Sequence, residues 1–219
     1  MTNRQEKEKI KIKGVMKGSC LWGILLFFIL LLVDQLTKLA ADVYFNLEGA
    51  PQSLTVIPNL IYLTISYNRG IAFGVAATSP LPLKIGIIIG TVVMMAGIAV
   101  LYFKIDKRRS VVRTALVLVF SGGIGNLIDR VYYRVWDPAS YLGGVRDGVR
   151  DMVDLNAFGL AVCNFADFFI VIGAIVLLLG FLFFDRDAFF PVGKYKEMAK
   201  EQEAKEEAKK AAKKEKEEK

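Results

Sequence analysis

The sequence predicts an all-α membrane protein with a small β element: four transmembrane helices, both termini cytoplasmic, and a small extracytoplasmic β-cradle. Hydrophobic residues make up 54% of the 219 residues, and the mean hydropathy of +0.40 exceeds that of ordinary soluble domains. Long uncharged runs separate the charged segments, and the basic residues are distributed unevenly among those segments. We therefore divide the chain into a basic cytoplasmic segment (1–17), a membrane domain (18–190) and a charged cytoplasmic tail (191–219).

Four uncharged runs predict the helices, and they are Gly18–Val33, Ile85–Phe103, Thr114–Ile128 and Phe168–Phe184. A helix that crosses a bilayer needs about 20 residues, so the second and fourth runs are long enough unaided. The first run needs a polar extension through Asp34 and Lys38 to about Asp42, and Asp129 ends the third. We expect these polar groups to face the interior of the bundle, because lipid does not tolerate them.

The distribution of basic residues predicts the orientation in the membrane. Residues 1–17 hold six Lys or Arg and residues 104–113 hold five, whereas residues 34–83 hold only Lys38 and Arg69. The positive-inside rule places both termini and the 104–113 loop in the cytoplasm. Because no small-residue cleavage motif follows the first apolar run, we expect a retained anchor and not a cleaved signal peptide.

The segments between the predicted helices differ in character. Residues 60–67 are rich in β-branched and aromatic side chains, which favours strands with Pro58-Asn59 as the turn. Residues 132–151 combine Gly, aromatic and charged residues, and we expect a loop or short hairpin at the membrane interface. The tail alternates Lys, Glu and Ala, which is typical of an exposed helix or a disordered appendage.

The composition narrows the available chemistry. The chain has no histidine and two cysteines, so His-containing triads and dyads are excluded and the usual zinc sites lack ligands. Asp154 and Asp167 lie among apolar sequence neighbours, which favours the protonated form of a carboxyl group. A pair of such acids can share one proton and activate water. The alternative is that both only cap helices or contact lipid headgroups, since Asp167 begins a helix.

Other polar residues are interpreted as supporting groups. Asp34 and Lys38 are spaced i, i+4 and can pair on one helix face. Asp129 precedes Arg130, which predicts a structural salt bridge between them.

Two asparagines and two loop aspartates are the next polar residues to interpret. Asn126 and Asn164 each precede an acid by three residues, and can orient that acid or only satisfy polar groups inside the bundle. Asp147 and Asp151 alternate with arginines, as solvated loop charges do.

Five blocks of sequence, DQLTK (34–38), NRGIAFG (68–74), GNLIDR (125–130), VDL (153–155) and NFAD (164–167), resemble the lipoprotein signal peptidase (signal peptidase II) family over residues 18–184. The resemblance implies an aspartyl endopeptidase of the bacterial inner (cytoplasmic) membrane. Its members remove the signal peptide from diacylglyceryl-modified prolipoproteins and cleave before the lipidated cysteine. The 132–151 segment is longer than the family pattern and is interpreted as an insertion, and Leu155 replaces a more usual phenylalanine.

By motif, the resemblance assigns the catalytic dyad to Asp154 and Asp167. It assigns supporting roles to eight residues, Asp34, Lys38, Asn68, Gly70, Asn126, Asp129, Arg130 and Asn164. It implies that the outer sheet forms a cradle over the site and that no metal is needed, and we expect no other cofactor. The expected partners are prolipoprotein substrates and membrane lipid, without nucleic acid, and the expected state is a monomer.

A different class of function also fits some of these features: a non-catalytic small transporter or assembly factor that uses acids at the membrane boundary. A transporter tends to place its acids near the midplane, on broken or repeated helices. Here the acids cluster toward one side, and the sequence has no internal repeat. These observations favour the peptidase.

Overall fold

The computed structural model describes residues 20–70, 80–107, 109–135 and 148–184, and in the C-terminal segment residues 190, 192–193, 195–198, 200, 204 and 207–208. The predictions for residues 1–17, for residues 136–147 of the interfacial loop and for most of the tail lie outside the described residues.

Four long helices form the membrane domain: α2 (Cys20–Phe45), α3 (Leu81–Lys104), α4 (Ser110–Tyr132) and α5 (Phe165–Leu182). Each is long and apolar enough to cross a membrane. The predicted polar extension of α2 is present, because α2 continues beyond Lys38 to Phe45, whereas α4 ends at Tyr132, beyond its predicted end at Asp129. The four-helix prediction is confirmed.

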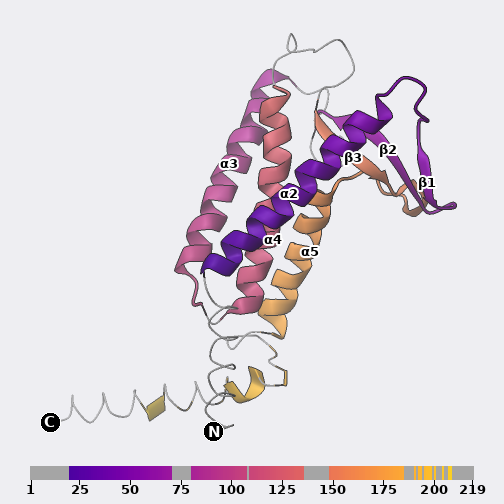
Figure 1. Cartoon of the computed structure of the whole chain (residues 1–219). Helices are drawn as coiled ribbons and strands as arrows, with labels where there is room; N and C mark the ends of the chain where they lie inside the picture. Colours follow the sequence, from indigo (N-terminus) through magenta and orange to yellow (C-terminus); the bar gives the residue numbers. More distant parts are fainter. Residues whose placement is uncertain are drawn as a thin grey trace, which may run out of the picture.

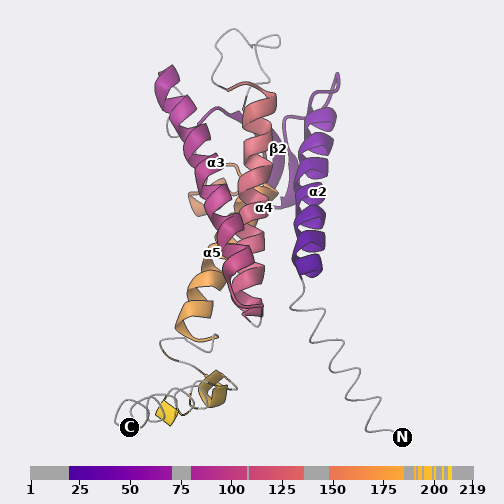
Figure 2. The ribbon, with the colours of Figure 1, turned by 90° about the vertical axis from the view of Figure 1, so that its left-hand side faces the viewer.

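Helix α4 lies at the centre of the bundle and packs against α2, α3 and α5 (Figures 1 and 2). Glycines permit the closest approaches. A Cβ atom added to Gly122 of α4 would overlap the backbone oxygen of Ala166 in α5. A Cβ added to Gly173 of α5 would lie 2.8 Å from Cγ2 of Val119. Small residues at such contacts are typical of membrane helices, whose packing depends on close van der Waals contact.

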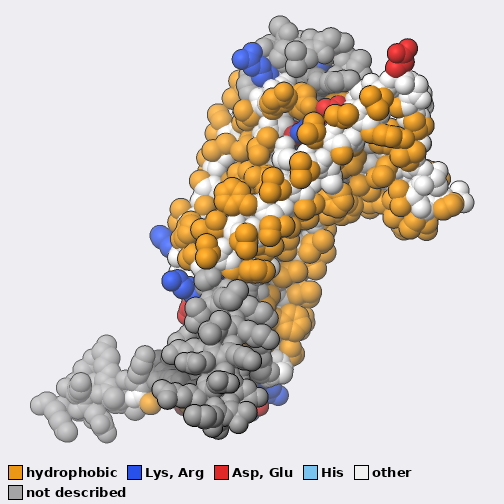
Figure 3. Space-filling view, in the orientation of Figure 1, with side chains coloured by type: hydrophobic (Ala, Val, Ile, Leu, Met, Phe, Trp, Pro, Cys, Tyr) orange, Lys and Arg blue, Asp and Glu red, His pale blue; other side chains and the backbone are white. Residues whose placement is uncertain are grey.

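The outer surface of the helices is apolar, and hydrophobic side chains cover most of the face shown in Figure 3. In α2 the buried residues include Asp34 and Lys38, whereas Leu25, Phe28 and Leu32 are exposed. This inverts the pattern of a water-soluble helix and suits a helix surrounded by hydrocarbon. The chain is a multi-pass membrane protein.

A three-stranded antiparallel sheet extends to one side of the bundle (Figure 1), in the order β1 (Leu54–Ile57), β2 (Ile61–Asn68), β3 (Val149–Asp154). The predicted hairpin is confirmed, and Asn59 in its turn has φ of 64°, a conformation that asparagine tolerates. The third strand was not predicted: residues 149–151, expected in a loop, pair with β2. A short 3₁₀ turn, η2 (Asn156–Phe158), follows β3.

Candidate active site

A cavity of about 450 Å³ lies between α3, α4, α5 and the end of the sheet. Helices α3 and α5 both pack against α4 but have at most slight contact with each other, so α4 forms the floor between two walls. Most lining side chains are apolar, and the polar ones are Asn68, Thr91, Asn126, Arg130, Asp151 and Asp167. Apolar walls with a few converging polar groups are typical of a ligand site.

Two carboxyl groups, Asp151 and Asp167, line this cavity and share one partner. The side-chain amide of Asn164 donates to Oδ1 of Asp151 at 2.6 Å, and its backbone N–H donates to Oδ2 of Asp167 at 3.0 Å. The Asn164 side chain also accepts from the backbone N–H of Asp167 at 3.1 Å, which completes a capping box at the start of α5. One buried asparagine therefore holds both acids.

The surroundings of the two acids differ. Burial raises the pKa of Asp151 to about 7, and the charge of Asp167 raises it further, against hydrogen bonds from Asn164 and Asn68. Asp167 accepts hydrogen bonds from the Asn126 amide (2.8 Å) and from the Asn164 backbone N–H at the start of α5. Because its pKa is near neutral, Asp151 can carry the proton that a general acid donates, beside a second carboxyl group.

The structure places only one member of the predicted dyad, Asp167, at this cavity. Asp154 ends β3, is paired there with Tyr62, and does not line the cavity. Successive strand residues point to opposite faces, so Asp151 and Asp154, three apart, face opposite ways. Asp151, expected as a solvated loop charge, is only 3% exposed. Apolar neighbours in the sequence singled out Asp154, but in a strand these are not the neighbours in space.

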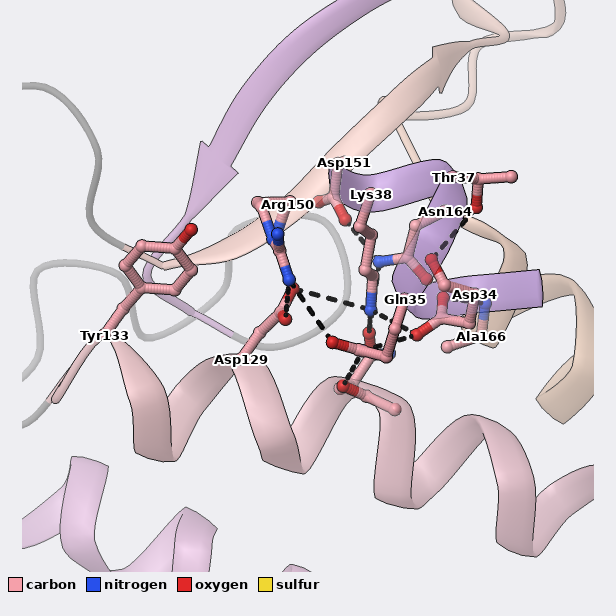
Figure 4. Close-up of polar contacts among 12 residues, drawn as sticks. Asp34, Gln35, Thr37, Lys38, Asp129, Tyr133, Arg150, Asp151, Asn164 and Ala166 are labelled. Carbon is pink, nitrogen blue, oxygen red and sulfur yellow. Dashed lines mark hydrogen bonds and ion pairs between the residues drawn. The ribbon is translucent and has the colours of Figure 1, made fainter. Parts of the chain in front are cut away.

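A buried cluster of four charged side chains lies beside the dyad (Figure 4). Nζ of Lys38 lies 2.9 Å from Oδ2 of Asp34 and 3.5 Å from Oδ2 of Asp129. Nη2 of Arg150 lies 2.7 Å from Oδ1 of Asp129. The predicted Asp34–Lys38 pair is confirmed, whereas the described ion pairs of Asp129 are with Lys38 and Arg150 and not with the predicted Arg130. Two acids and two bases make the cluster neutral.

Asn126 connects this cluster to the dyad. Its Oδ1 accepts from Nζ of Lys38 at 3.0 Å and from the Asn164 amide at 3.1 Å. Because both contacts need an oxygen, the NH₂ group of Asn126 must face Asp167, to which it donates. Asn164 bonds the acid three residues after it, as predicted, whereas Asn126 bonds Asp167 and the described hydrogen bonds do not join it to Asp129.

On the sheet side the cavity is lined by Asn68 of β2, and Arg130 of α4 also lines it. The Asn68 side chain hydrogen-bonds Asp151 and accepts from the backbone N–H of Gly70 at 2.9 Å. Nη2 of Arg130 donates to the carbonyl of Gly70 at 3.3 Å. Seven of the eight predicted supporting residues therefore line the cavity, belong to the buried cluster or lie between them, and Gly70 hydrogen-bonds two of the lining residues.

Gln35 and Arg150 also belong to this buried polar network, although they are not among the predicted site residues. Gln35 donates to Oδ2 of Asp34 (2.9 Å) and to the carbonyl of Gly125 (3.1 Å), and its Oε1 accepts from Arg150 (3.3 Å). The only sequence signal for Gln35 is its position beside Asp34 in a predicted membrane helix. Arg150 had no signal, because its partners come from α2 and α4.

Cysteine and metal chemistry find little support in the described part of the chain. Cys163 lines the cavity, but burial and then the charges of Asp167, Asp151 and Asp154 raise its pKa to about 12, so its nucleophilic thiolate is scarce. Among the residues that the structure describes, no three acidic or cysteine side chains form a group that could hold a metal ion.

Comparisons with known proteins identify related sequences and a related structure. A sequence profile described as signal peptidase (SPase) II matches residues 26–183. A lipoprotein signal peptidase of Fusobacterium nucleatum is 32% identical over 171 residues, 77% of this chain and 91% of that protein. One from Pelotomaculum thermopropionicum is 36% identical over 149 residues, 68% of this chain and 84% of that protein. A bacterial membrane enzyme solved by the in meso method matches with a TM-score of 0.58 and 26% identity, covering 74% of this chain and 94% of that one.

Proposed function

Because the chain belongs to the signal peptidase II family, whose members are aspartic proteases, we propose that Asp151 and Asp167 are its catalytic dyad and that it removes the signal peptide from prolipoproteins. The observation that carries this proposal is the shared contact of both carboxyl groups with Asn164 at the polar end of an apolar cavity. The geometry supports Asp151 in place of Asp154, and retains Asp167.

The two acids have different roles in the proposed reaction. Asp167, which accepts hydrogen bonds from Asn126 and Asn164, takes a proton from a water molecule, whose oxygen attacks the peptide carbonyl. Asp151, protonated, donates its proton to the carbonyl oxygen as that oxygen gains charge. The tetrahedral intermediate returns this proton to Asp151, while Asp167 gives its new proton to the leaving amine. Each acid thus recovers its starting state.

The shape of the cavity supports a lipid-modified substrate that arrives from the bilayer. Its walls carry Met94 of α3 and Phe168, Ile170 and Val171 of α5, and the two walls do not pack closely on each other. Acyl chains of a diacylglyceryl group can remain in hydrocarbon while the peptide reaches the dyad. We propose that cleavage occurs before the lipidated cysteine.

The location and assembly of the protein are part of the proposal. The basic residues of the loop between α3 and α4 support an orientation with the dyad on the outer side of a bacterial inner membrane. A cysteine in place of exposed Glu48, in a chain without Cys20 and Cys163, should react with an impermeant maleimide from outside, and one in place of Lys107 should not. The opposite labelling pattern would reverse the orientation. We propose a monomer, and a dimer mass in detergent would contradict it.

Three matched variants test the dyad: Asp151→Asn, Asp154→Asn and Asp167→Asn, each purified in detergent and incubated with a synthetic diacylglyceryl prolipoprotein peptide. We expect Asp151→Asn and Asp167→Asn to lose roughly 10²–10⁴-fold in kcat, because each removes one proton-transfer group. Asp154→Asn should stay within about threefold of the unaltered enzyme, since the residue lies outside the cavity.

Size-exclusion profiles of the three variants show whether each is folded. Retained turnover in folded Asp151→Asn, with loss in Asp154→Asn, would restore the motif-based assignment. Absence of cleavage by the unaltered protein would favour a transporter or assembly factor.

A further inference from the structure

We propose that Arg150 is a positioning residue for Asp151: its guanidinium joins strand β3 to α4 and α2 and fixes the catalytic acid opposite Asp167. This inference rests on the proposed function of Asp151. Arg150 immediately precedes Asp151, and by strand alternation its side chain points to the face opposite the cavity.

The strand pairing beside Asp151 is irregular. Leu63 pairs with Val153 and Ser66 pairs with Asp151, so β2 has one residue more than β3 between these pairs. Such a bulge disrupts the hydrogen-bond ladder and bends the strand that contains it. The ladder alone therefore specifies the position of Asp151 weakly, and another contact must hold β3 against the helices.

Arg150 supplies that contact at several points (Figure 4). Its Nη2 lies 2.7 Å from Oδ1 of Asp129 and its Nε lies 3.4 Å from Oδ2. Its backbone N–H donates to the same Oδ2 at 3.0 Å, and Nη2 also donates to Oε1 of Gln35 at 3.3 Å. The guanidinium lies over the ring of Tyr133, 5.5 Å from its centroid. A planar fork held by a carboxylate and an amide fixes both the distance and the direction of the strand.

The effect of the positive charge of Arg150 and the effect of its contact geometry can be tested separately. Arg150 is 8% exposed, and Asp34, Lys38 and Asp129 are fully buried. Removing the charge of Arg150 leaves a net negative charge in the cluster, and breaking a buried ion pair in this way is strongly destabilising. Lysine keeps the positive charge, but its ammonium group is a point charge and lacks the planar, multi-donor shape of a guanidinium. Arg150→Lys therefore tests geometry at constant charge.

We expect folded Arg150→Lys to lose about 10–100-fold in kcat with KM changed less than about twofold, since misplacement of a catalytic group by about 1 Å has effects of this size. The high-pH limb of its kcat/KM profile should also move, because Asp151 would have a different distance to Asp167. A merely structural role would lower the yield of folded protein and leave kcat per folded molecule and the pH profile unchanged. Arg134→Lys, at an exposed arginine, is the matched control.

A second pair of variants addresses failure to fold. Arg150→Met should reduce the yield of folded protein, and Asp129→Asn/Arg150→Met should restore it because the cluster is again neutral. We expect the double variant to keep the low kcat, since the fork is absent. Native kcat and pH profile in either folded Arg150→Lys or the folded double variant would overturn the inference.

Asp151→Asn, measured in parallel, separates the two proposals. If that variant is active, the proposed dyad is wrong. If it is inactive while Arg150→Lys behaves as the unaltered enzyme, the dyad stands and only the role of Arg150 is wrong.

Discussion

At the scale of a single residue, the proton on Asp151 affects both the stability of the folded protein and the proposed catalysis. Burial raises the pKa of this carboxyl from an ordinary 3.8 to about 7. Between these values the native state keeps the proton and the unfolded chain releases it, so the native state binds more protons. Stability must therefore fall as pH rises from about 4 to about 7, and the full stability contribution is present only below the lower value.

A comparison with the Asp151→Asn variant should show this loss of stability at high pH. Asparagine keeps an oxygen that can accept from Asn164 but never ionises. At pH 8 we expect the variant to be more stable than the unaltered protein, by on the order of a few kcal/mol, with the difference shrinking toward pH 5. Thermal unfolding in detergent at both pH values measures this, with Asp154→Asn as control. An equal difference at the two pH values would contradict the assigned titration.

The same titration sets the expected pH dependence of turnover. Asp151 must be protonated to donate to the carbonyl oxygen, so kcat/KM should decline as pH rises through about 7. The unaltered enzyme measured between pH 5 and pH 9 with the synthetic peptide provides this profile. A rate that stays constant up to pH 9 would mean that Asp151 is not the acid.

At the scale of elements, the helices could be predicted and the third strand could not. A membrane-spanning helix must be apolar along its whole length, so the sequence itself records where α2, α3, α4 and α5 lie. Strand β3 depends on a partner far away in the chain, since Asp151 is opposite Ser66. The alternation of Asp147 and Asp151 with Arg146 and Arg150 in the sequence predicts solvated loop charges instead.

Most residues of the candidate site could also be predicted from the sequence, whereas Asp151 and Arg150 could not. Asp167 and the eight supporting residues lie in recognisable blocks on helices or beside the hairpin. Asp151 and Arg150 acquire their environment through contacts with α2, α4, Asn68 and Asn164, and the residues next to them in the sequence do not reveal these contacts.

The close contact between α4 and α5 gives an element-scale prediction. A methyl group on Gly173 would lie 2.8 Å from Cγ2 of Val119 and 2.9 Å from its backbone nitrogen. Gly173→Ala should therefore force α5 away from α4 and destabilise the protein by about 1–3 kcal/mol. Gly97→Ala in α3 is the matched control, because a Cβ there meets nothing within 4 Å. Detergent unfolding midpoints that fall equally in both variants would contradict this packing.

At the scale of the whole molecule, the membrane explains why polar groups are concentrated in one place. Lipid surrounds the helices, so charged side chains of α2, α4 and β3 are buried together and neutralise one another. The sheet is held to the bundle by this cluster as well as by strand pairing. The proposed dyad therefore lies where α3, α4, α5 and the sheet meet, and its position depends on several elements together.

Helix α3 contributes no described residue to this charged cluster. Within residues 80–107, none of the described ion pairs or side-chain hydrogen bonds joins α3 to the charge cluster. At its far end, Tyr102 lies against Gly23 of α2 and under the guanidinium of Arg113, 4.4 Å from the ring centroid. Beside the cavity the buried contact of α3 is apolar instead, because Met95 is 3% exposed and packs against Gly123 of α4, next to the lining residues Thr91 and Met94.

We expect this difference to affect substrate admission: α3 should tilt about its Tyr102 end, with its apolar contact at Met95 sliding over Gly123. This tilt should widen the passage beside the proposed dyad without breaking the buried ion pairs of α2, α4 and β3. Spin labels at exposed Ile89 and Val171 should give a longer or broader distance distribution when the lipidated peptide is added. Labels at Val100 and Leu178, near the anchored end, should not change. Identical distributions for the first pair, with and without peptide, would mean that the bundle admits its substrate as a rigid body.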